Sequence, residues 1–372
     1  MATRKDAFKA KFNNRYLTSR KWLSVSVLAL LAIASISMAF AQAGNGNTTQ
    51  STKRPLVVAS FIPQNGNDPN FLQFVVPQPT IDAIMERYDW SALNPVQGVF
   101  DFTQVDSDIA KWRALGKQTV VLVSLVSDSV GPQSPNTATP AWVLKQVPQV
   151  TCTFIAPNKI PVMYDQKVMA FTQPFIVALL QHLDTQAPSV AYVRVGMFLG
   201  GENCPLCKNT LPAGETTALN YLQQMSSYIH AHHPAGTRLV ENCSACFAGT
   251  SYDLQSGNIL GGQGLGLGQE DLSASDVQGN KAGTCSWCNV FNAHPRAFKY
   301  LQAACDLSKP GCPPQPSSAF PTYFPFAETF NVDAVELPTT PVLALAYVPN
   351  YKAPDGGTYN QFHQQYQNAL AH

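Results

Sequence analysis

The chain has little charge. Of its 372 residues only 13% are Asp, Glu, Lys or Arg. Seven of the 24 basic residues fall within residues 1–22, and residues 44–372 retain 17 basic against 22 acidic residues, a net charge near −5. Without a basic patch, nucleic acid is excluded as a partner. Short sequence repeats are also lacking, which excludes a solenoid.

The N-terminal segment has the pattern of an export signal. Basic residues precede an uncharged apolar run at 23–40, and Ala-x-Ala motifs end at Ala41 and Ala43. This order is typical of a secretory signal. We predict a cleaved signal peptide at 1–43, a flexible linker of small polar residues at 44–54, and a secreted or periplasmic protein. An uncleaved membrane anchor is the alternative, because 18 apolar residues reach the lower limit for a membrane span; the membrane is a partner only through this segment.

Strand-like and helix-like segments alternate through residues 55–372, which predicts an α/β fold with parallel strands. We expect strands at 56–62, 81–90, 119–126, 190–199, 238–242, 264–270, 323–329, 334–337 and 342–347. We expect helices at 106–115, 168–183, 217–230 and 359–371. Their number and the domain length of about 330 residues suit a single-domain (β/α)8 TIM barrel.

Glu202 follows the predicted strand 190–199 across Gly200 and Gly201. The carboxyl end of an inner strand is where a (β/α)8 barrel places catalytic groups. The two glycines permit an unusual backbone and the close approach of a ligand. The strand count makes 190–199 the fourth strand, so we predict that Glu202 is catalytic. The structural alternative is a solvated Glu in an ordinary turn.

Residues 87–102, RYDWSALNPVQGVFDF, resemble a signature of retaining glycoside hydrolases with a TIM barrel. That signature is Trp-x-x-apolar-x-Pro-x-x-Gly-x-aromatic-(Asp or Asn)-aromatic, and it runs here into a predicted helix, a Gly116-Lys117 turn and a predicted strand. Pro140-Ala141-Trp142 resembles the loop that lines the sugar site. The resemblance is to clan A, in particular the β-galactosidase-like families 42 and 5. It covers 80–205 well and 260–340 loosely, as in a divergent member.

The resemblance implies a retaining glycosidase acting on an oligo- or polysaccharide without a cofactor. An acid/base Glu would end the fourth strand and a nucleophilic Glu the seventh, with the two carboxyls about 5–5.5 Å apart. The strand count assigns these roles to Glu202 and Glu328. Glu270, at the end of the predicted sixth strand, is the rival nucleophile. Glu336 has apolar neighbours, so we expect it to be buried with a basic partner.

Sugar binding needs aromatic faces and a few polar groups. The residues that we assign to substrate binding are Trp142, Asn203, Glu270 and Trp287. Clan members have Asn directly before the acid/base Glu, whereas this chain has Gly201 there and Asn203 after it. This departure leaves a catalytically inactive carbohydrate-binding barrel as the first alternative.

Nine cysteines are present, six of them in C-x-x-C pairs that each follow a predicted strand. In a cytosolic protein such pairs would indicate zinc or an iron–sulfur cluster. After a secretory signal, disulfides are favoured. We therefore predict no metal, and disulfides that staple loops at the carboxyl face of the barrel, with a metal or redox protein as the last alternative. The candidate cysteines are Cys204, Cys207, Cys243, Cys246, Cys285, Cys288, Cys305 and Cys312, with Cys152 as the odd one out.

Overall fold

The computed structural model describes residues 54–60, 69–127, 136–151, 159–199, 214–232, 239–242, 251–272, 286–303, 327–338 and 343–352. The chain divides into a unit at 1–52 and a compact unit at 53–372, and every described residue belongs to the second. The predicted signal peptide and most of the predicted linker therefore lie outside the described residues. No helix in the described ranges is long and apolar enough to span a membrane.

Eight parallel strands form a closed barrel in the order β1-β10-β9-β8-β7-β6-β3-β2. The strands are β1 (Leu56–Ser60), β2 (Ala83–Asp89), β3 (Gln118–Val126), β6 (Val190–Leu199), β7 (Leu239–Asn242), β8 (Gly266–Leu272), β9 (Lys299–Ala303) and β10 (Ala334–Pro338). The predicted α/β barrel is confirmed.

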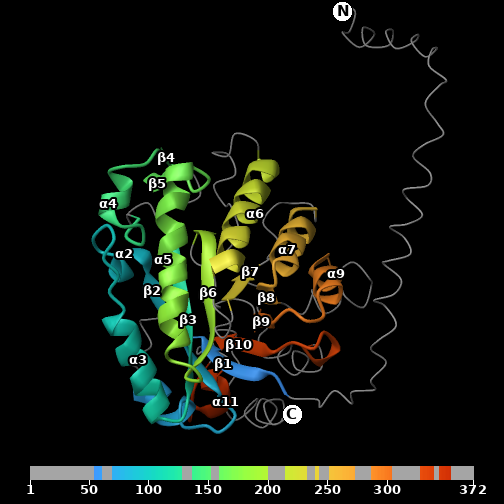
Figure 1. Ribbon diagram of the computed structural model, residues 1–372. Coiled ribbons are helices and arrows are strands. Elements are labelled where there is room, and N and C mark those ends of the chain that lie inside the picture. The colour runs from blue at the N-terminus through green and yellow to red at the C-terminus, as the bar shows by residue number, and fades with distance from the viewer. Residues whose placement is uncertain are drawn as a thin grey trace, which may run out of the picture. The chain divides into compact units, whose positions relative to one another are not determined.

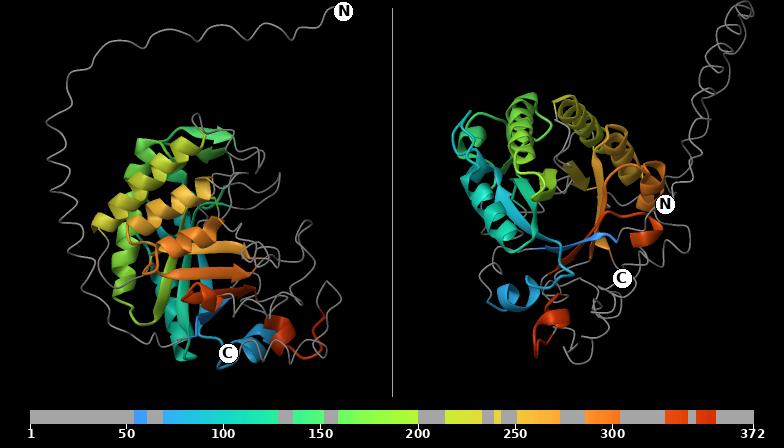
Figure 2. Two further views of the ribbon diagram at one scale, coloured as in Figure 1. Left: turned by 90° about the vertical axis from the view of Figure 1, so that its right-hand side faces the viewer. Right: turned by 60° about the horizontal axis from the view of Figure 1, so that its bottom comes forward.

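The long helices lie along the outside of the strands (Figures 1 and 2). They are α3 (Thr103–Ala114), α5 (Gln166–Asp184), α6 (Glu215–His232), α7 (Ser251–Gly262) and α9 (Ser286–Ala293). Shorter elements are η2 (Phe71–Val75), α2 (Trp90–Leu93), α4 (Ala141–Leu144), α11 (Ala344–Tyr347) and the antiparallel pair β4 (Gln149–Thr151) and β5 (Lys159–Pro161). The helices predicted at 106–115, 168–183 and 217–230 correspond to α3, α5 and α6.

Three predictions about the C-terminal half are wrong. The seventh strand is β9, which the sequence analysis missed. Residues 327–329 form a helical turn rather than the end of a strand. The apolar run at 342–347 was predicted as a strand, but Ala344–Tyr347 is the helix α11. Periodicity alone does not separate a short buried helix from a strand, so an apolar run of this length supports either.

Two buried clusters show that side chains along the strands point alternately to the outside and the inside of the barrel. One lies between the strands and the outer helices and includes Ile84 and Tyr88 of β2. The other fills the inside of the barrel and includes Ala83 and Met85 of the same strand. Successive β2 residues therefore point alternately outward and inward, and Arg87 and Asp89 continue the inward row.

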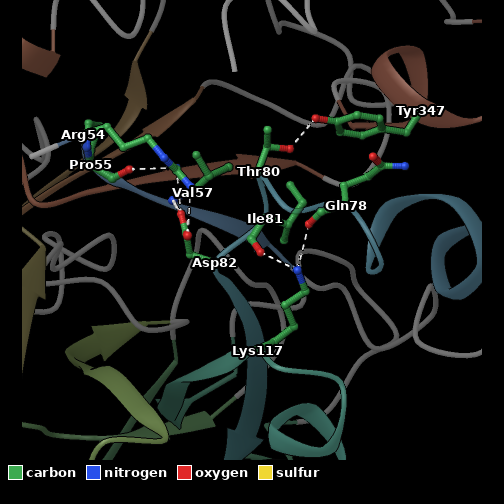
Figure 3. A network of polar contacts seen from close by, with 9 residues as sticks. All are labelled: Arg54, Pro55, Val57, Gln78, Thr80, Ile81, Asp82, Lys117 and Tyr347. Carbon is green, nitrogen blue, oxygen red and sulfur yellow. Dashed lines mark hydrogen bonds and ion pairs between the residues drawn. The ribbon is translucent and has the colours of Figure 1, made fainter. Parts of the chain in front are cut away.

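An ion pair holds the start of β1 beside the start of β2 (Figure 3). Arg54 donates to both carboxylate oxygens of Asp82, at 2.9 and 3.0 Å, and the same carboxylate accepts from the Val57 amide at 2.8 Å. The backbone ladder between β1 and β2 pairs only two positions on each strand, Val58 with Ala83 and Ala59 with Ile84. Side-chain contacts therefore reinforce the junction of β1 and β2, where few backbone positions pair.

Lys117 supports the same end of the barrel from the turn before β3. Its Nζ donates to the carbonyls of Gln78 at 2.7 Å and Ile81 at 2.6 Å, and burial lowers the pKa of its ammonium group. The hydroxyls of Thr80 and Tyr347 also meet in Figure 3, which ties α11 to the segment before β2. These contacts tie together the amino-terminal ends of β1, β2 and β3, and barrel enzymes carry their substrate sites at the other end of the barrel.

Candidate active site

Arg87 and Asp89 occupy the inward row at the carboxyl end of β2. Ala83 and Met85, below them in this row, belong to the cluster inside the barrel. Arg87 is half-buried, and its Nε donates to the Ser124 hydroxyl of β3 at 2.9 Å. The second and third strands thus bring a guanidinium, a carboxylate and a hydroxyl toward the mouth of the barrel. Carboxyl ends of all eight strands meet at this mouth, where barrel enzymes carry out their chemistry.

A buried ion pair crosses the barrel below the mouth. Arg194 of β6 contacts Glu336 of β10 through its Nη1, 2.6 Å from Oε2, and the Tyr192 hydroxyl donates to Oε1 of the same carboxylate at 2.6 Å. Glu336 and Tyr192 are fully buried and Arg194 is 2% exposed. Burial and then the Glu336 charge raise the pKa of Tyr192 well above its ordinary value, so its hydroxyl stays protonated. The prediction that Glu336 is buried with a basic partner is confirmed.

Tyr300 of β9 completes this arrangement. The Arg194 guanidinium carbon lies 4.6 Å from the centroid of the Tyr300 ring, and the Tyr192 and Tyr300 rings stack at 6.0 Å with planes 22° apart. On β8, a Cβ added to Gly268 would fall 1.7 Å from a carbon of the Tyr300 ring. We call Tyr192, Arg194, Tyr300 and Glu336 the interior network. Because its side chains are buried inside the barrel below the mouth, we expect a substrate to bind above it.

Glu202 and Asn203 lie outside the described residues. The strand before them is β6, the fourth strand of the barrel, with the predicted bounds Val190–Leu199. The Gly200-Gly201-Glu202 sequence therefore begins directly at the carboxyl end of that strand. Glu270 lies near the carboxyl end of β8, the sixth strand, and its side chain is outside the described set.

Glu328 does not end a strand, so the basis of its assignment is wrong. It lies in the helical turn at 327–329, which continues into the amino end of β10, and its side chain is exposed. This segment is bound to the amino ends of neighbouring strands: the Lys299 amide donates to the Asp333 carboxylate at 2.9 Å, and the Leu56 amide donates to the Asp333 carbonyl at 2.8 Å. Glu328 is therefore at the end of the barrel away from the mouth, where it cannot pair with a group that follows β6.

The described contacts of Trp142 are structural. Its indole Nε1 donates to the Asn94 carbonyl at 2.9 Å, and its ring meets Phe171 edge-on at 4.9 Å and Trp90 at 6.3 Å. These contacts join α4 to α2 and α5. Trp287 belongs to α9, and its side chain lies outside the described residues.

Cys288 is the one cysteine that the described residues include. It is 4% exposed and disulfide-bonded, and its partner lies outside the described ranges. The remaining predicted pairings also fall outside them. Within the described part of the chain, no three His, Cys, Asp or Glu side chains come together as a metal site would require.

The sequence analysis missed Arg87, Asp89, Arg194 and Tyr300 as parts of this site. For Arg194 a signal existed, because an arginine inside the apolar strand 190–199 must be paired when it is buried. Its partner could not be read from the sequence, since Glu336 is 142 residues away.

No protein-family model matches the chain, and no curated protein matches it. Among solved structures, the chain is similar to endo-glycoceramidase II from Rhodococcus sp. in its lactosyl-enzyme intermediate, with 14% identity, a TM-score of 0.50, and coverage of 82% of this chain and 77% of that one. The complex of the same enzyme with a five-membered iminocyclitol gives 12% identity, a TM-score of 0.50, and coverage of 86% and 78%. At such identities the likeness shows a shared fold. That enzyme is a clan A glycoside hydrolase, so the predicted resemblance is confirmed at the level of fold.

Proposed function

We propose that the chain is an exported glycoside hydrolase that cleaves a glycosidic bond of an oligo- or polysaccharide by retaining double displacement. The observation that carries the proposal is the position of Gly200-Gly201-Glu202, directly after the carboxyl end of the fourth strand of a closed (β/α)8 barrel. The predicted export signal and the low charge of residues 44–372 agree with an extracellular, largely neutral substrate.

Glu202 is the acid/base in this proposal, and Glu270 replaces Glu328 as the nucleophile. Glu270 follows Gly268, which faces the barrel interior, and lies near the carboxyl end of β8. β6 and β8 are separated by β7 alone. With about 4.8 Å between neighbouring strands, the ends of β6 and β8 lie roughly 10 Å apart, and Glu side chains that follow two strands at this spacing are long enough to reach the separation of about 5–5.5 Å that a retaining pair needs.

The two carboxyls differ in protonation. In the first step Glu202 protonates the leaving oxygen while the Glu270 carboxylate attacks the anomeric carbon, and a covalent glycosyl-enzyme forms. In the second step Glu202, now ionised, takes a proton from the water that attacks the anomeric carbon and releases the sugar. Repulsion between two nearby carboxylates raises the pKa of one of them, which keeps the acid protonated. The lactosyl-enzyme intermediate of the similar structure supports this chemistry by analogy of fold.

The remaining assignments are also part of the proposal. Asn203 hydrogen-bonds a sugar hydroxyl and Trp287 stacks on a sugar ring. Disulfides among the eight candidate cysteines hold the loops around the mouth, and the chain needs no cofactor.

The test is a screen of aryl glycosides and oligosaccharides with protein exported through an oxidising compartment. Glu202→Gln and Glu270→Gln should each lose at least about 10³-fold in kcat, because each removes a group that acts in the transition state. Glu328→Gln, at the other end of the barrel, should keep wild-type activity. Asp306 is the one acidic residue between β9 and the 327–329 turn, so Asp306→Asn tests whether the nucleophile follows the seventh strand instead of the sixth. An NMR measurement of whether the configuration at the anomeric carbon is retained tests the double displacement.

An inactive carbohydrate-binding barrel remains the second candidate function because Gly201 stands where clan members have Asn. Oligosaccharide binding without turnover, unchanged in Glu202→Gln, would replace the glycosidase proposal with this one.

A further inference from the structure

We propose that Gln302 is a sugar-binding residue whose side-chain amide hydrogen-bonds a hydroxyl of the substrate at the mouth of the barrel. The inference rests on the proposed function, because it concerns the sugar that the barrel takes. Gln302 is the fourth of the five residues of β9, the seventh strand of the barrel.

Two observations place the Gln302 side chain inside the barrel. On its own strand, Tyr300 belongs to the cluster inside the barrel and Leu301 to the cluster beneath the outer helices. Because successive side chains of a strand point to opposite faces, Gln302 points inward like Tyr300. On the neighbouring strand β10, Gln302 is in register with Glu336, whose carboxylate pairs with Arg194 in the barrel interior.

Gln302 is the first inward side chain of β9 above the interior network. Tyr300, two residues earlier on the same inward row, is fully buried, and so is Glu336 on the neighbouring strand. Gln302 is only half-buried, and it is followed by Ala303 alone before the strand ends. Burial therefore decreases along this row toward the mouth, and the amide lies where the closed interior gives way to the accessible mouth.

The interior network does not use this amide. Oε1 of Glu336 accepts from the Tyr192 hydroxyl and Oε2 accepts from Arg194. Within the described ranges, no residue forms a hydrogen bond with the Gln302 side chain. A side-chain amide offers one acceptor oxygen and two donor hydrogens, and polar groups away from bulk solvent are hydrogen-bonded by protein, water or ligand. The Gln302 amide is therefore available to water or to a ligand in the mouth.

A sugar hydroxyl matches the chemistry of this position. A hydroxyl both donates and accepts, as the amide does, so the bond can form in either direction. Neither group is charged, which suits a position beside Glu336, where a second carboxylate would repel the buried charge. A hydroxyl that displaces a water from the amide restores its hydrogen bond, whereas a sugar without this hydroxyl leaves the amide unpaired. Gln302 therefore selects sugars that present a hydroxyl to the seventh strand.

The experiment measures binding, so it does not depend on turnover. The exported protein is titrated by calorimetry with S-linked analogues of cellobiose, lactose, mannobiose and xylobiose, whose sulfur bridge resists hydrolysis. Gln302→Met keeps the length of the side chain and removes its amide. We expect this variant to bind the tightest of these sugars about 3- to 10-fold more weakly than wild type, because one neutral hydrogen bond is lost.

Gln118→Met is the matched control. Gln118 is also half-buried and lies on the inward row of β3, which continues through Val120 and Leu122. It stands at the amino-terminal end of that strand, where its amide donates to the Pro188 carbonyl at 2.7 Å. A sugar in the mouth does not reach this end of the barrel, so Gln118→Met should bind the sugar as wild type does.

Monodeoxy derivatives of the same S-linked sugar identify the hydroxyl that Gln302 contacts. Removing that hydroxyl should weaken binding to wild type and leave binding to Gln302→Met unchanged, because the two partners are coupled and one is already lost. Removing any other hydroxyl should weaken binding to both proteins equally.

A Gln302→Met variant that binds as tightly as wild type, or no more weakly than Gln118→Met, would overturn the inference and leave the proposed hydrolysis standing. The expected loss of binding in Gln302→Met, without turnover of the O-linked sugars by wild type, would support the inference and overturn the hydrolysis. A wild type that binds none of these sugars overturns both. If Gln302→Met does not fold, Gln302→Asn, which withdraws the amide by one methylene, replaces it and should show the same loss.

Discussion

Glu86 makes the stability of the barrel depend on pH in a direction opposite to that of most surface carboxylates. It points outward from β2 toward α3, is 8% exposed, and accepts a hydrogen bond from the Trp112 indole at 2.9 Å. Burial raises the pKa of its carboxyl to about 7, and the nearby charge of Asp108 adds to this, while Trp112 and Lys111 oppose it. The carboxyl is therefore largely protonated in the folded protein below neutral pH.

The sign of the effect follows from proton binding. The folded state holds this proton up to about pH 7, whereas the ordinary pKa is 4.5. Between these values the folded state binds more protons than the unfolded state, so the free energy of unfolding falls as the pH rises. At about 1.4 kcal/mol per pKa unit, ionising Glu86 costs the folded state roughly 3 kcal/mol above pH 7.

Glu86→Gln removes this cost and keeps an oxygen that accepts from Trp112. We expect the variant to be more stable than wild type by up to about 3 kcal/mol at pH 8, with the difference shrinking toward pH 5. Urea unfolding at pH 5, 6, 7 and 8, followed by tryptophan fluorescence, measures it. Glu328→Gln, an exposed carboxyl variant, should show little difference from wild type. Equal differences at pH 5 and pH 8, or a Glu86→Gln variant less stable at pH 8, would refute the reasoning.

Three further predictions concern other contacts. Asp82→Ala removes the acceptor for Arg54 and the Val57 amide and should lower the free energy of unfolding by about 1–2 kcal/mol, with Arg54→Met costing less; equal losses would mean that the amide bond is unimportant. Trp142→Phe should cost about 1 kcal/mol through the lost bond to the Asn94 carbonyl and leave KM unchanged, whereas a tenfold rise in KM would make Trp142 a sugar-binding residue. Thiol titration of unreduced, denatured protein should find one free thiol, and elemental analysis no bound zinc; several free thiols or stoichiometric metal would favour the cysteine-rich metal alternative.

Local pattern was enough where a strand is apolar along most of its length. The strand predicted at 190–199 has those bounds, and 119–126 misses one residue of β3. Parallel strands covered on both faces carry such continuous apolar runs. Helices with one apolar face, such as α5, were found for the related reason that burial follows the helical period.

β9 was missed because its five residues carry Lys299 and Gln302 in place of an apolar run. Lys299 is 2% exposed, and its Nζ lies 3.3 Å from the Phe330 carbonyl, which accepts from it. Only the tertiary contact makes this lysine compatible with a buried strand. With β9 missed, the segment 323–329 was counted as the seventh strand in its place, and this made Glu328 look like the end of that strand.

The sequence by itself determined the class of fold and the most informative catalytic candidate, because the alternation of buried segments and a Gly-Gly-Glu sequence directly after an apolar strand are local properties. Tertiary structure alone decided which end of the barrel Glu328 occupies, which acid Arg194 pairs with, and why β8 needs a glycine beside Tyr300. Those facts depend on residues far apart in the chain meeting inside one closed barrel. Periodicity shows that a side chain is buried, but only the packed fold shows what it is buried against.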